Sequence, residues 1–374
     1  MKIVFNTRYP NAVASILYRE ALSGLDNIDF FKRDKYEEYD VALFMSYTKD
    51  LDELGKVRDT NNKIKIGIID PRGEIHRKYL SNFDFIIVDS IEMKDFFSQY
   101  RKPIFTYYEY QPLKRITKKH INKTPIIISY HGNKVHLESM FPRITTALDL
   151  LSEKYALEFW AMYNIEKLGR WEVGLPQKIP VKHIQWSENN YYDYLAEADI
   201  GIVPCFMPIK NINKLKRNSI ISKQHFLDTK DDYLLKFKVP TNAGRLIVFS
   251  LLGLPVVADM VPSATQFIED GVSGFLAYNT GGWYLALESL IKSAALRNKL
   301  SINNYTRIQS VIDYDNQNKR FKVFLDDVIK ISREKDNNSI PTIHPTIDIV
   351  KSFYFKYKSV YRISSLIYKK MLYR

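Results

Sequence analysis

The stretch from Lys236 to Leu276 constrains the fold of this 374-residue chain more than any other part of the sequence. Its apolar segments are separated by Gly and Pro residues of the kind that begin and end helices and strands. A helix, a buried strand and a second helix in this order form a unit of a parallel α/β sheet. The predicted elements are a basic loop from Lys236, a helix from about Thr241 to Leu252, a turn at Gly253–Pro255, a strand at Val256–Ala258, a second helix from about Ser263, and a turn between Gly271 and Gly274.

Such a unit places the N-termini of its helices at the carboxyl edge of the sheet. The first N–H groups of a helix have no partner within the helix, and they carry partial positive charge. Lys236, Lys238 and Arg245 flank the predicted start of the first helix, and Asn242 lies in its first turn. These residues favour the binding of a phosphate at this edge, where Asn242 would form a hydrogen bond to a phosphate or a ribose.

The same stretch resembles the donor-binding core of glycosyltransferases with the GT-B fold, particularly the retaining enzymes around glycosyltransferase family 4. The match lies in "G-x-P-V-V" at residues 253–257, in Pro262, and in "I-x-x-G-x-x-G-x-L" at residues 268–276. The segments "Y-H-G-N" at residues 130–133 and "A-D-I-G-I-V-P" at residues 198–204 extend the resemblance to roughly residues 125–330. It implies an α/β fold with two Rossmann-like domains facing across a cleft, a nucleotide-sugar donor on the second domain, and no bound metal or other cofactor.

The chain departs from the resembled family at one functional feature. The family has a pair of glutamates eight positions apart, and these would fall on Pro240 and Val248, which cannot act as carboxylates. We therefore expect the fold and the donor-binding region without the family's carboxylate chemistry. Lys238 and Arg245 are expected to stabilise the departing diphosphate as catalytic residues. The expected donor-binding residues are His131, Gly132, Asn133, Lys238, Thr241, Asn242, Arg245 and Ser263.

Charge and composition narrow the class of protein further. The chain is long enough for two domains, and its net charge of +13 indicates an anionic partner such as a nucleotide diphosphate, an anionic membrane surface or nucleic acid. Its one cysteine, Cys205, excludes an intramolecular disulfide and is expected to be a buried thiol. No pair of the seven histidines has the spacing of a metal site. With no signal-peptide pattern at the N-terminus, we expect a cytoplasmic protein.

Residues 1–115 are predicted to form the acceptor-side Rossmann-like domain. Loops that follow its parallel strands should meet at the carboxyl edge of the sheet, where open α/β sheets bind their ligands. Asp70 and Arg72 lie in one of these loops, and they could contact an acceptor hydroxyl or phosphate. An ion-paired turn at the surface is the structural alternative. If transfer inverts the anomeric centre, a general base is required, and Asp70 is the candidate.

The second half begins after a polar, basic linker at residues 116–124, and the donor domain is predicted at residues 125–317. His131, Gly132 and Asn133 directly follow its first strand and are expected to face the cleft, although a lone histidine is often only structural.

Residues 206–232 form a long basic segment without clear periodicity. Such a segment is either a lid that carries cations to the diphosphate or a solvated insertion.

A crossover helix is predicted at residues 318–335, and residues 336–374 form a basic aromatic tail. Within the tail, residues 346–374 interleave Lys and Arg with Tyr and Phe and contain one acid. This pattern suits the headgroup region of an anionic membrane, whereas a helix packed on the protein itself or an oligomer contact is the alternative. Nucleic acid is not the expected partner of this tail, because no recognised binding motif accompanies the basic residues.

These observations predict a glycosyltransferase that moves a sugar from a nucleotide-diphosphate donor to a cell-surface glycan or a lipid-linked acceptor at the inner face of a membrane. Retention of the anomeric configuration is favoured over inversion. Three alternatives remain open. One is a catalytically inactive GT-B-like protein that binds glycans, the second is a GT-B-fold nucleotide-sugar epimerase, and the third is a basic nucleic-acid binder.

Overall fold

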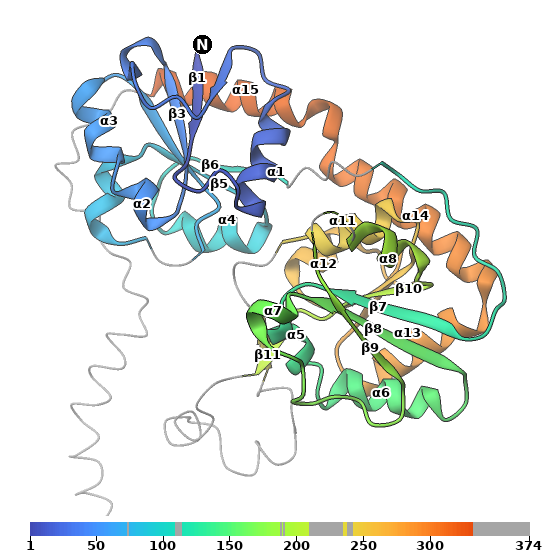
Figure 1. The fold of residues 1–374 in the computed structure, drawn as a ribbon. Helices are drawn as coiled ribbons and strands as arrows, with labels where there is room; N and C mark the ends of the chain where they lie inside the picture. Colours follow the sequence, from blue (N-terminus) through green and yellow to red (C-terminus); the bar gives the residue numbers. More distant parts are fainter. Residues whose placement is uncertain are drawn as a thin grey trace, which may run out of the picture.

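The computed structural model describes residues 1–72, 75–108, 114–187, 189, 191–208, 235–237 and 242–331. These residues form two α/β domains, each built on a parallel sheet of six strands (Figure 1). Helices cover the sheets, and the predicted α/β class with two Rossmann-like domains is confirmed. Among the described residues, no helix is long and apolar enough to cross a membrane.

The N-terminal sheet has the strand order β2-β1-β3-β4-β5-β6. Alternate side chains of β3 enter different hydrophobic clusters, because successive residues of a strand point to opposite faces: Leu43 and Met45 pack on one face, and Ala42 and Phe44 on the other. The elements are β1 (Ile3–Asn6), α1 (Val13–Leu22), β2 (Ile28–Phe30), η1 (Tyr36–Glu38), β3 (Val41–Met45), α2 (Thr48–Leu51), α3 (Leu54–Thr60), β4 (Lys65–Ile69), η2 (Arg77–Asn82), β5 (Phe85–Val88), α4 (Ile91–Ser98) and β6 (Ile104–Thr106).

The C-terminal sheet has the strand order β14-β13-β10-β7-β8-β9. Its first elements are β7 (Ile126–His131), α5 (Lys134–Glu138), α6 (Arg143–Ser152), β8 (Leu157–Tyr163), α7 (Ile165–Leu168), β9 (Val181–Gln185), α8 (Tyr191–Glu197) and β10 (Ile200–Val203). They are followed by β11 (Phe206–Pro208), β12 (Leu235–Phe237), α11 (Gly244–Leu251), β13 (Val256–Asp259), α12 (Pro262–Phe267), β14 (Phe275–Ala277), α13 (Thr280–Lys292), α14 (Ala294–Ile312) and α15 (Tyr314–Lys330).

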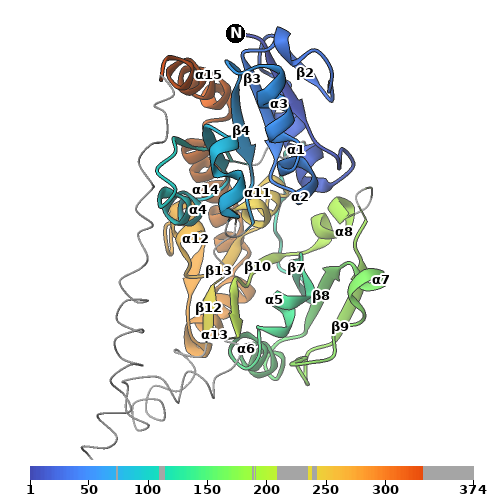
Figure 2. The ribbon, with the colours of Figure 1, turned by 90° about the vertical axis from the view of Figure 1, so that its left-hand side faces the viewer.

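Helix α15 returns the chain to the N-terminal domain (Figures 1 and 2). Its Phe321 and Leu325 are fully buried in the cluster that covers one face of the N-terminal sheet. The Phe321 ring lies 5.1 Å from the ring of Phe105. At the start of the helix, Asn318 donates a hydrogen bond to the carbonyl of Ala21 at 3.1 Å and accepts one from the Tyr107 hydroxyl at 2.6 Å. The last helix of the described chain therefore belongs to the core of the first domain.

The polar segment between the domains is bound to the second domain along residues 116–121. The backbone N–H of Ile116 donates to the carbonyl of Leu251 at 2.7 Å, and the His120 ring contacts the carbonyl of Gly253 at 2.9 Å. The Lys118 ammonium donates to the carbonyls of Ala196 and Ala198, and burial lowers the pKa of this lysine to about 8. A polar composition alone does not reveal this attachment.

Two features of the second domain differ from the sequence prediction. The segment at Lys236, predicted as a basic loop, is strand β12, which pairs antiparallel with β11. Helix α11 begins at Gly244, whereas a start near Thr241 was predicted. Thr241, Lys238, Pro240, most of the basic segment at 206–232 and the tail at 336–374 lie outside the described residues.

Candidate functional site between the two domains

The N-terminal side of the candidate site is built where strands β3, β4 and β5 end. Asp70 directly follows β4, and its backbone N–H donates to the carbonyl of Ile87 at 2.9 Å. Ser46 follows β3, and its hydroxyl donates to the Asp70 carbonyl at 2.8 Å. Asp70 has a φ angle of 55°, in the left-handed region that non-glycine residues seldom adopt. The strand ends therefore hold a buried aspartate in an unusual conformation at the ligand-binding edge.

Arg72 joins two aspartates at this edge. Its guanidinium donates from Nε to Asp70 Oδ2 at 2.8 Å, and Nη2 lies 2.6 Å from the same oxygen. Nη2 also lies 3.7 Å from Oδ2 of Asp89, which directly follows β5. The two carboxylates are 4% and 1% exposed. Asp70 and Arg72, which sequence analysis predicted as site residues, thus form an ion pair. Asp89 lies beside them because the neighbouring parallel strands β4 and β5 end at the same edge of the sheet.

Burial raises the pKa of Asp89, whereas the Arg72 charge and a hydrogen bond from Asn242 oppose that shift. Oδ1 of Asp89 is buried and has no hydrogen-bond partner among the described residues. An acidic residue directly after an apolar strand is the sequence signal that could have singled it out. The strand end therefore carries a second carboxylate, set among charged and amide groups from both domains.

The two domains meet through contacts from helices α11 and α12. The Asn242 amide donates from Nδ2 to Asp89 Oδ2 at 3.0 Å, and its Oδ1 accepts from the N–H of Gly244 at 3.2 Å. The N–H of Ser263 donates to Glu92 of α4 at 3.2 Å, so this helix N-terminus is engaged by the first domain. The packing of α4 on α12 is visible in Figures 1 and 2. Asn242 and Ser263, both expected to bind the donor, lie at the domain contact.

The C-terminal side of the candidate site begins at the end of β7. Gly132 has a φ angle of 138°, and a Cβ placed there would lie 2.7 Å from the Tyr130 hydroxyl and 3.4 Å from Cδ of Arg245. The position therefore requires glycine. Asn133 caps α5 by accepting a hydrogen bond from the N–H of Val135 at 3.0 Å. The sequence prediction of a close backbone approach at Gly132 agrees with this geometry.

Arg245 lies in the first turn of α11 and reaches the same loop. Its Nη1 donates to the carbonyl of Pro204 at 2.8 Å, and Nη2 lies 3.4 Å from the sulfur of Cys205. The guanidinium carbon is 5.7 Å from the centre of the Tyr130 ring. Cys205 is buried, as predicted, and burial raises its pKa to about 11. Arg245 is thus held beside the β7 loop by fixed backbone and side-chain partners.

His131 is 8% exposed and packs edge-to-face on Phe249, with 5.0 Å between the ring centres. Burial and the charge of Arg245 lower the pKa of this histidine to about 3. The imidazole is therefore neutral at physiological pH, and Nε2 has no hydrogen-bond partner among the described residues. A neutral ring can donate or accept a hydrogen bond to a ligand, but it does not supply positive charge there.

A buried ion pair supports the loops on the C-terminal side. Asp259 ends β13, and its carboxylate accepts from Arg143 at 2.9 Å and from the N–H groups of Cys205 and Phe206 at 2.8 and 3.0 Å. The indole of Trp283 donates to it as well, at 3.2 Å. Sequence analysis did not identify this pair, because its members come from α6 and β13, which are distant along the chain. The pair fixes the loop that carries the Pro204 carbonyl bound by Arg245.

Two predicted site residues, Lys238 and Thr241, lie outside the described residues. Val248, one of the two positions where the resembled family has glutamate, is 3% exposed in the apolar cluster beneath α11. A carboxylate there would be buried among apolar side chains. In this chain that position has a packing role.

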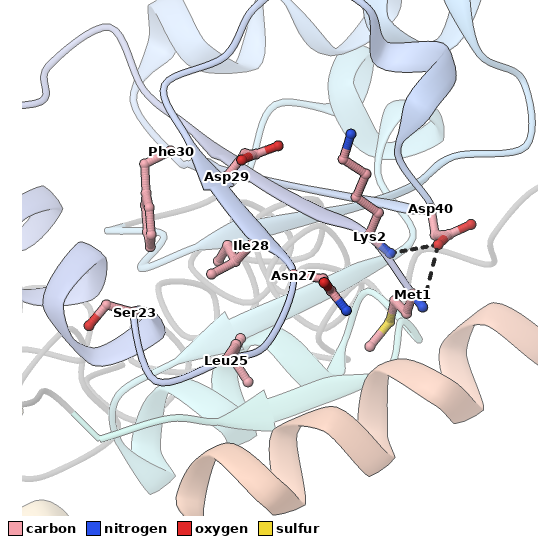
Figure 3. A pocket seen from close by; sticks show the side chains of 9 residues that line it. All are labelled: Met1, Lys2, Ser23, Leu25, Asn27, Ile28, Asp29, Phe30 and Asp40. Carbon is pink, nitrogen blue, oxygen red and sulfur yellow. Dashed lines mark hydrogen bonds and ion pairs between the residues drawn. The ribbon is translucent and has the colours of Figure 1, made fainter.

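A pocket of about 500 Å³ lies at the opposite edge of the N-terminal sheet (Figure 3). Its charged groups already bind one another: Asp40 accepts from the backbone N–H of Lys2 at 2.7 Å and lies 3.8 Å from the N-terminal ammonium. Lys2 also pairs with Glu38 at 2.8 Å. Because the lining residues either precede β1, β2 and β3 or belong to the edge strand β2, this pocket is remote from the strand ends where the two domains meet.

Two parallel six-stranded sheets, with side chains from their helices and strand ends in contact between the domains, define the GT-B fold. Solved structures with this fold match nearly the whole chain. The HepE protein of Anabaena in complex with UDP is 12% identical and matches with a TM-score of 0.54, over 87% of this chain and 100% of its own.

Two further structures show the same likeness. The sucrose-phosphate synthase of Thermosynechococcus elongatus is 10% identical, with a TM-score of 0.57 over 89% of this chain and 100% of its own. A glycosyltransferase of Rickettsia africae is 12% identical, with a TM-score of 0.54 over 88% of this chain and 99% of its own. No protein-family model matches the chain, and no curated protein matches it in sequence. The likeness establishes the fold.

Proposed function

We propose that this protein is a glycosyltransferase that uses a nucleotide-diphosphate sugar. One observation carries the proposal: the Asp70–Arg72–Asp89 cluster of the first domain is hydrogen-bonded through Asn242 to the start of α11 in the second domain. The site thus joins a group of carboxylates on one sheet edge to a helix N-terminus on the other. Such an arrangement provides acceptor-side chemistry and anion binding in one place.

The donor is proposed to bind the second domain, with its diphosphate near the N-terminus of α11. Arg245, Lys238 and the helix N–H groups would neutralise the charge that develops on the departing diphosphate. Arg245 lies beside the Gly132 loop, where glycine permits a ligand to approach the backbone. Thr241, Asn242, Ser263, His131 and Asn133 complete the proposed donor contacts. UDP is the first nucleotide to test, because HepE has been solved with UDP and with UDP-glucose.

The acceptor is proposed to approach from the first domain, where Asp70 and Arg72 orient its hydroxyl. We propose that transfer retains the anomeric configuration by a front-face route in which the leaving phosphate takes the hydroxyl proton. Asp70 is the candidate general base if the reaction inverts instead. Closure of the domains around both substrates would exclude water and hold the reacting atoms in line.

The acceptor class that we propose is a cell-surface glycan or a lipid-linked glycan. The support for this is the sequence of residues 346–374, whose interleaved basic and aromatic side chains suit an anionic membrane surface. The protein would then act in the cytoplasm at the inner face of the membrane, without a bound metal. Nucleic acid is not a proposed partner.

A thermal-shift panel of UDP, GDP, ADP, CMP and dTDP, each with and without its sugar, tests the proposal. A ligand that binds only the folded state must raise the melting temperature. Selective stabilisation by one nucleotide is expected. Lys238→Ala should weaken the binding of that nucleotide by roughly 1.5–3 kcal/mol if the lysine forms a charged hydrogen bond to it. Stabilisation by none of these compounds would overturn the proposed donor site.

The competing function is that of a GT-B-like glycan-binding protein without catalysis. The burial of Val248, where the resembled family has a glutamate, favours it. Incubation with the selected nucleotide sugar separates the possibilities. Transfer to an added acceptor supports the proposal, a changed sugar without an acceptor indicates an epimerase, and glycan binding without turnover indicates the inactive protein.

A further inference from the structure

A second pocket of about 420 Å³ opens in the N-terminal domain, at the ends of β3 and β4. It lies between α2 and η2, and it includes Arg72, which also contacts Asp70 and Asp89. Its volume falls within the range of about 300–1,000 Å³ that is usual for small-molecule sites. Through Arg72, the pocket therefore adjoins the proposed catalytic cluster.

The floor of this pocket is apolar and buried. Leu51, Ile75 and Tyr79 are 7%, 7% and 6% exposed. The Tyr79 hydroxyl is fixed by donating a hydrogen bond to Asp52 at 2.6 Å. Sites for small molecules combine such a floor with a few polar groups that set the orientation of the ligand. A flat or aliphatic part of a ligand can lie on this surface.

The rim of the pocket carries cationic and hydrogen-bond-donating side chains. Arg72, His76 and Lys78 are exposed there, and none of the described residues that line the pocket is acidic. Nδ1 of His76 accepts a hydrogen bond from the N–H of Lys78 at 3.2 Å. A neutral ring must then carry its proton on Nε2, which makes that atom a donor. A rim of this kind attracts a negative charge.

Two nearby carboxylates position Lys78 and Arg72, and neither belongs to the described lining of the pocket. Asp52 lies 3.4 Å from the Lys78 ammonium, which also sits 4.5 Å from the centre of the Tyr79 ring. Asp70 binds the Arg72 guanidinium at 2.6 Å. Each carboxylate is outside the lining, so it restrains its cation at the edge of the pocket. A fixed cation binds an anion at a lower entropic cost than a mobile one.

We infer that this pocket binds an anionic group of the acceptor, a phosphate or a carboxylate, while the rest of the acceptor lies on the apolar floor. The inference rests on the proposed function, since it identifies the chemistry of the molecule that the first domain presents to the donor. Arg72 belongs to the pocket and to the carboxylate cluster at once. An anion at the rim therefore places the adjoining part of the acceptor beside Asp70 and Asp89.

Titration of the full-length protein with small probes tests this inference independently of turnover. The probes are glucose 6-phosphate, glucuronate and inorganic phosphate, with glucose as the neutral reference, and binding is measured by calorimetry with and without saturating UDP. We expect glucose 6-phosphate or glucuronate to bind at least fivefold more tightly than glucose, both with and without UDP. Whichever of these two sugars binds more tightly identifies the anion as a phosphate or a carboxylate. Equal binding of all sugars would overturn the inference.

Variants locate the binding. Lys78→Ala and His76→Ala should each weaken the anionic probe at least threefold, whereas Lys49→Ala should leave its affinity unchanged. Lys49 is an exposed lysine on the neighbouring helix α2 that does not line the pocket. Equal affinity in all three variants, or complete displacement of the probe by UDP, would place the anion elsewhere and overturn the inference. Because the probes are read without donor turnover, a failure here leaves the donor test unaffected, and the reverse also holds.

Discussion

Asp89 and Asn242, which are 153 positions apart in the chain, are joined by a hydrogen bond of 3.0 Å between the two domains. The Asn242 amide oxygen also accepts a hydrogen bond from the N–H of Gly244. The nitrogen and the oxygen of the amide therefore both have partners, which fixes the orientation of the side chain. The bond connects the end of β5 to the start of α11. A change in the charge of Asp89 therefore acts on the contact between the domains.

Asp89→Asn is expected to stabilise the protein at neutral pH. Burial raises the folded-state pKa of Asp89, so the stability that this carboxyl contributes is greatest when it is protonated and is lost as the pH rises through that pKa. The uncharged amide avoids this loss. Urea unfolding should show a higher midpoint for the variant at pH 7, and the difference should shrink toward pH 4. A variant that is less stable than the wild type at pH 7 would show that the contacts of the Asp89 carboxylate with Arg72 and Asn242 stabilise the fold by more than its burial costs.

His120→Gln should reduce the acid sensitivity of the fold. Burial lowers the pKa of His120 to about 4 from its ordinary value of 6.5, so its contribution to stability is present above pH 6.5 and is lost as the pH falls toward 4. The loss is at most roughly 1.4 kcal/mol per pH unit in that window. Glutamine does not titrate and can still donate to the Gly253 carbonyl. Free energies of unfolding at pH 7 and pH 5 should differ less in the variant than in the wild type.

Gly132→Ala is expected to destabilise the loop beside Arg245. Two effects add: a φ angle of 138°, and a new Cβ that would lie 2.7 Å from the Tyr130 hydroxyl. A strained backbone position alone costs about 1–3 kcal/mol. The matched control is Gly271→Ala, which also has a positive φ of 71° but has nothing within 4 Å of the added carbon. Chemical denaturation should show a larger loss at Gly132, and nucleotide affinity should fall only there. Equal losses would mean that the contact is relieved by a shift of Tyr130.

Asp259→Ala should be among the most destabilising single substitutions in the second domain. It leaves Arg143, which is 3% exposed, as a buried charge without its carboxylate. Breaking a buried pair in this way costs about 3–5 kcal/mol. Lys178→Ala removes a pair whose side chains are half exposed and should change stability by less than about 1 kcal/mol. Urea midpoints measure both effects, and a small loss for Asp259→Ala would mean that water reaches Arg143.

Local patterns in the sequence predict most of the fold. Apolar runs of strand length, each followed by a polar loop, indicate the strands of both sheets, and the parallel α/β class follows from their alternation with helices. Some short elements were missed, among them β2 and α4, whereas α11, which is as short as α4, was predicted. A strand of three residues or a helix of eight offers few positions in which a period can be recognised. The segment at Lys236 was predicted as a loop, because its strand partner β11 lies too far away along the chain for a local pattern to reveal the pairing.

The sequence by itself determined the order of elements, the glycine at position 132 and the placement of Asp70, Arg72, Asn242 and Arg245 at sheet edges or helix starts. These depend on backbone conformation and on periods that act over a few residues. Only the tertiary structure decided that Asp89 meets Asn242, that Arg143 and Asp259 form a buried pair, and that Arg72 and Lys78 line one pocket with Leu51 of α2. Such contacts depend on how distant segments are brought together, and a local pattern carries no record of which segment will supply the partner.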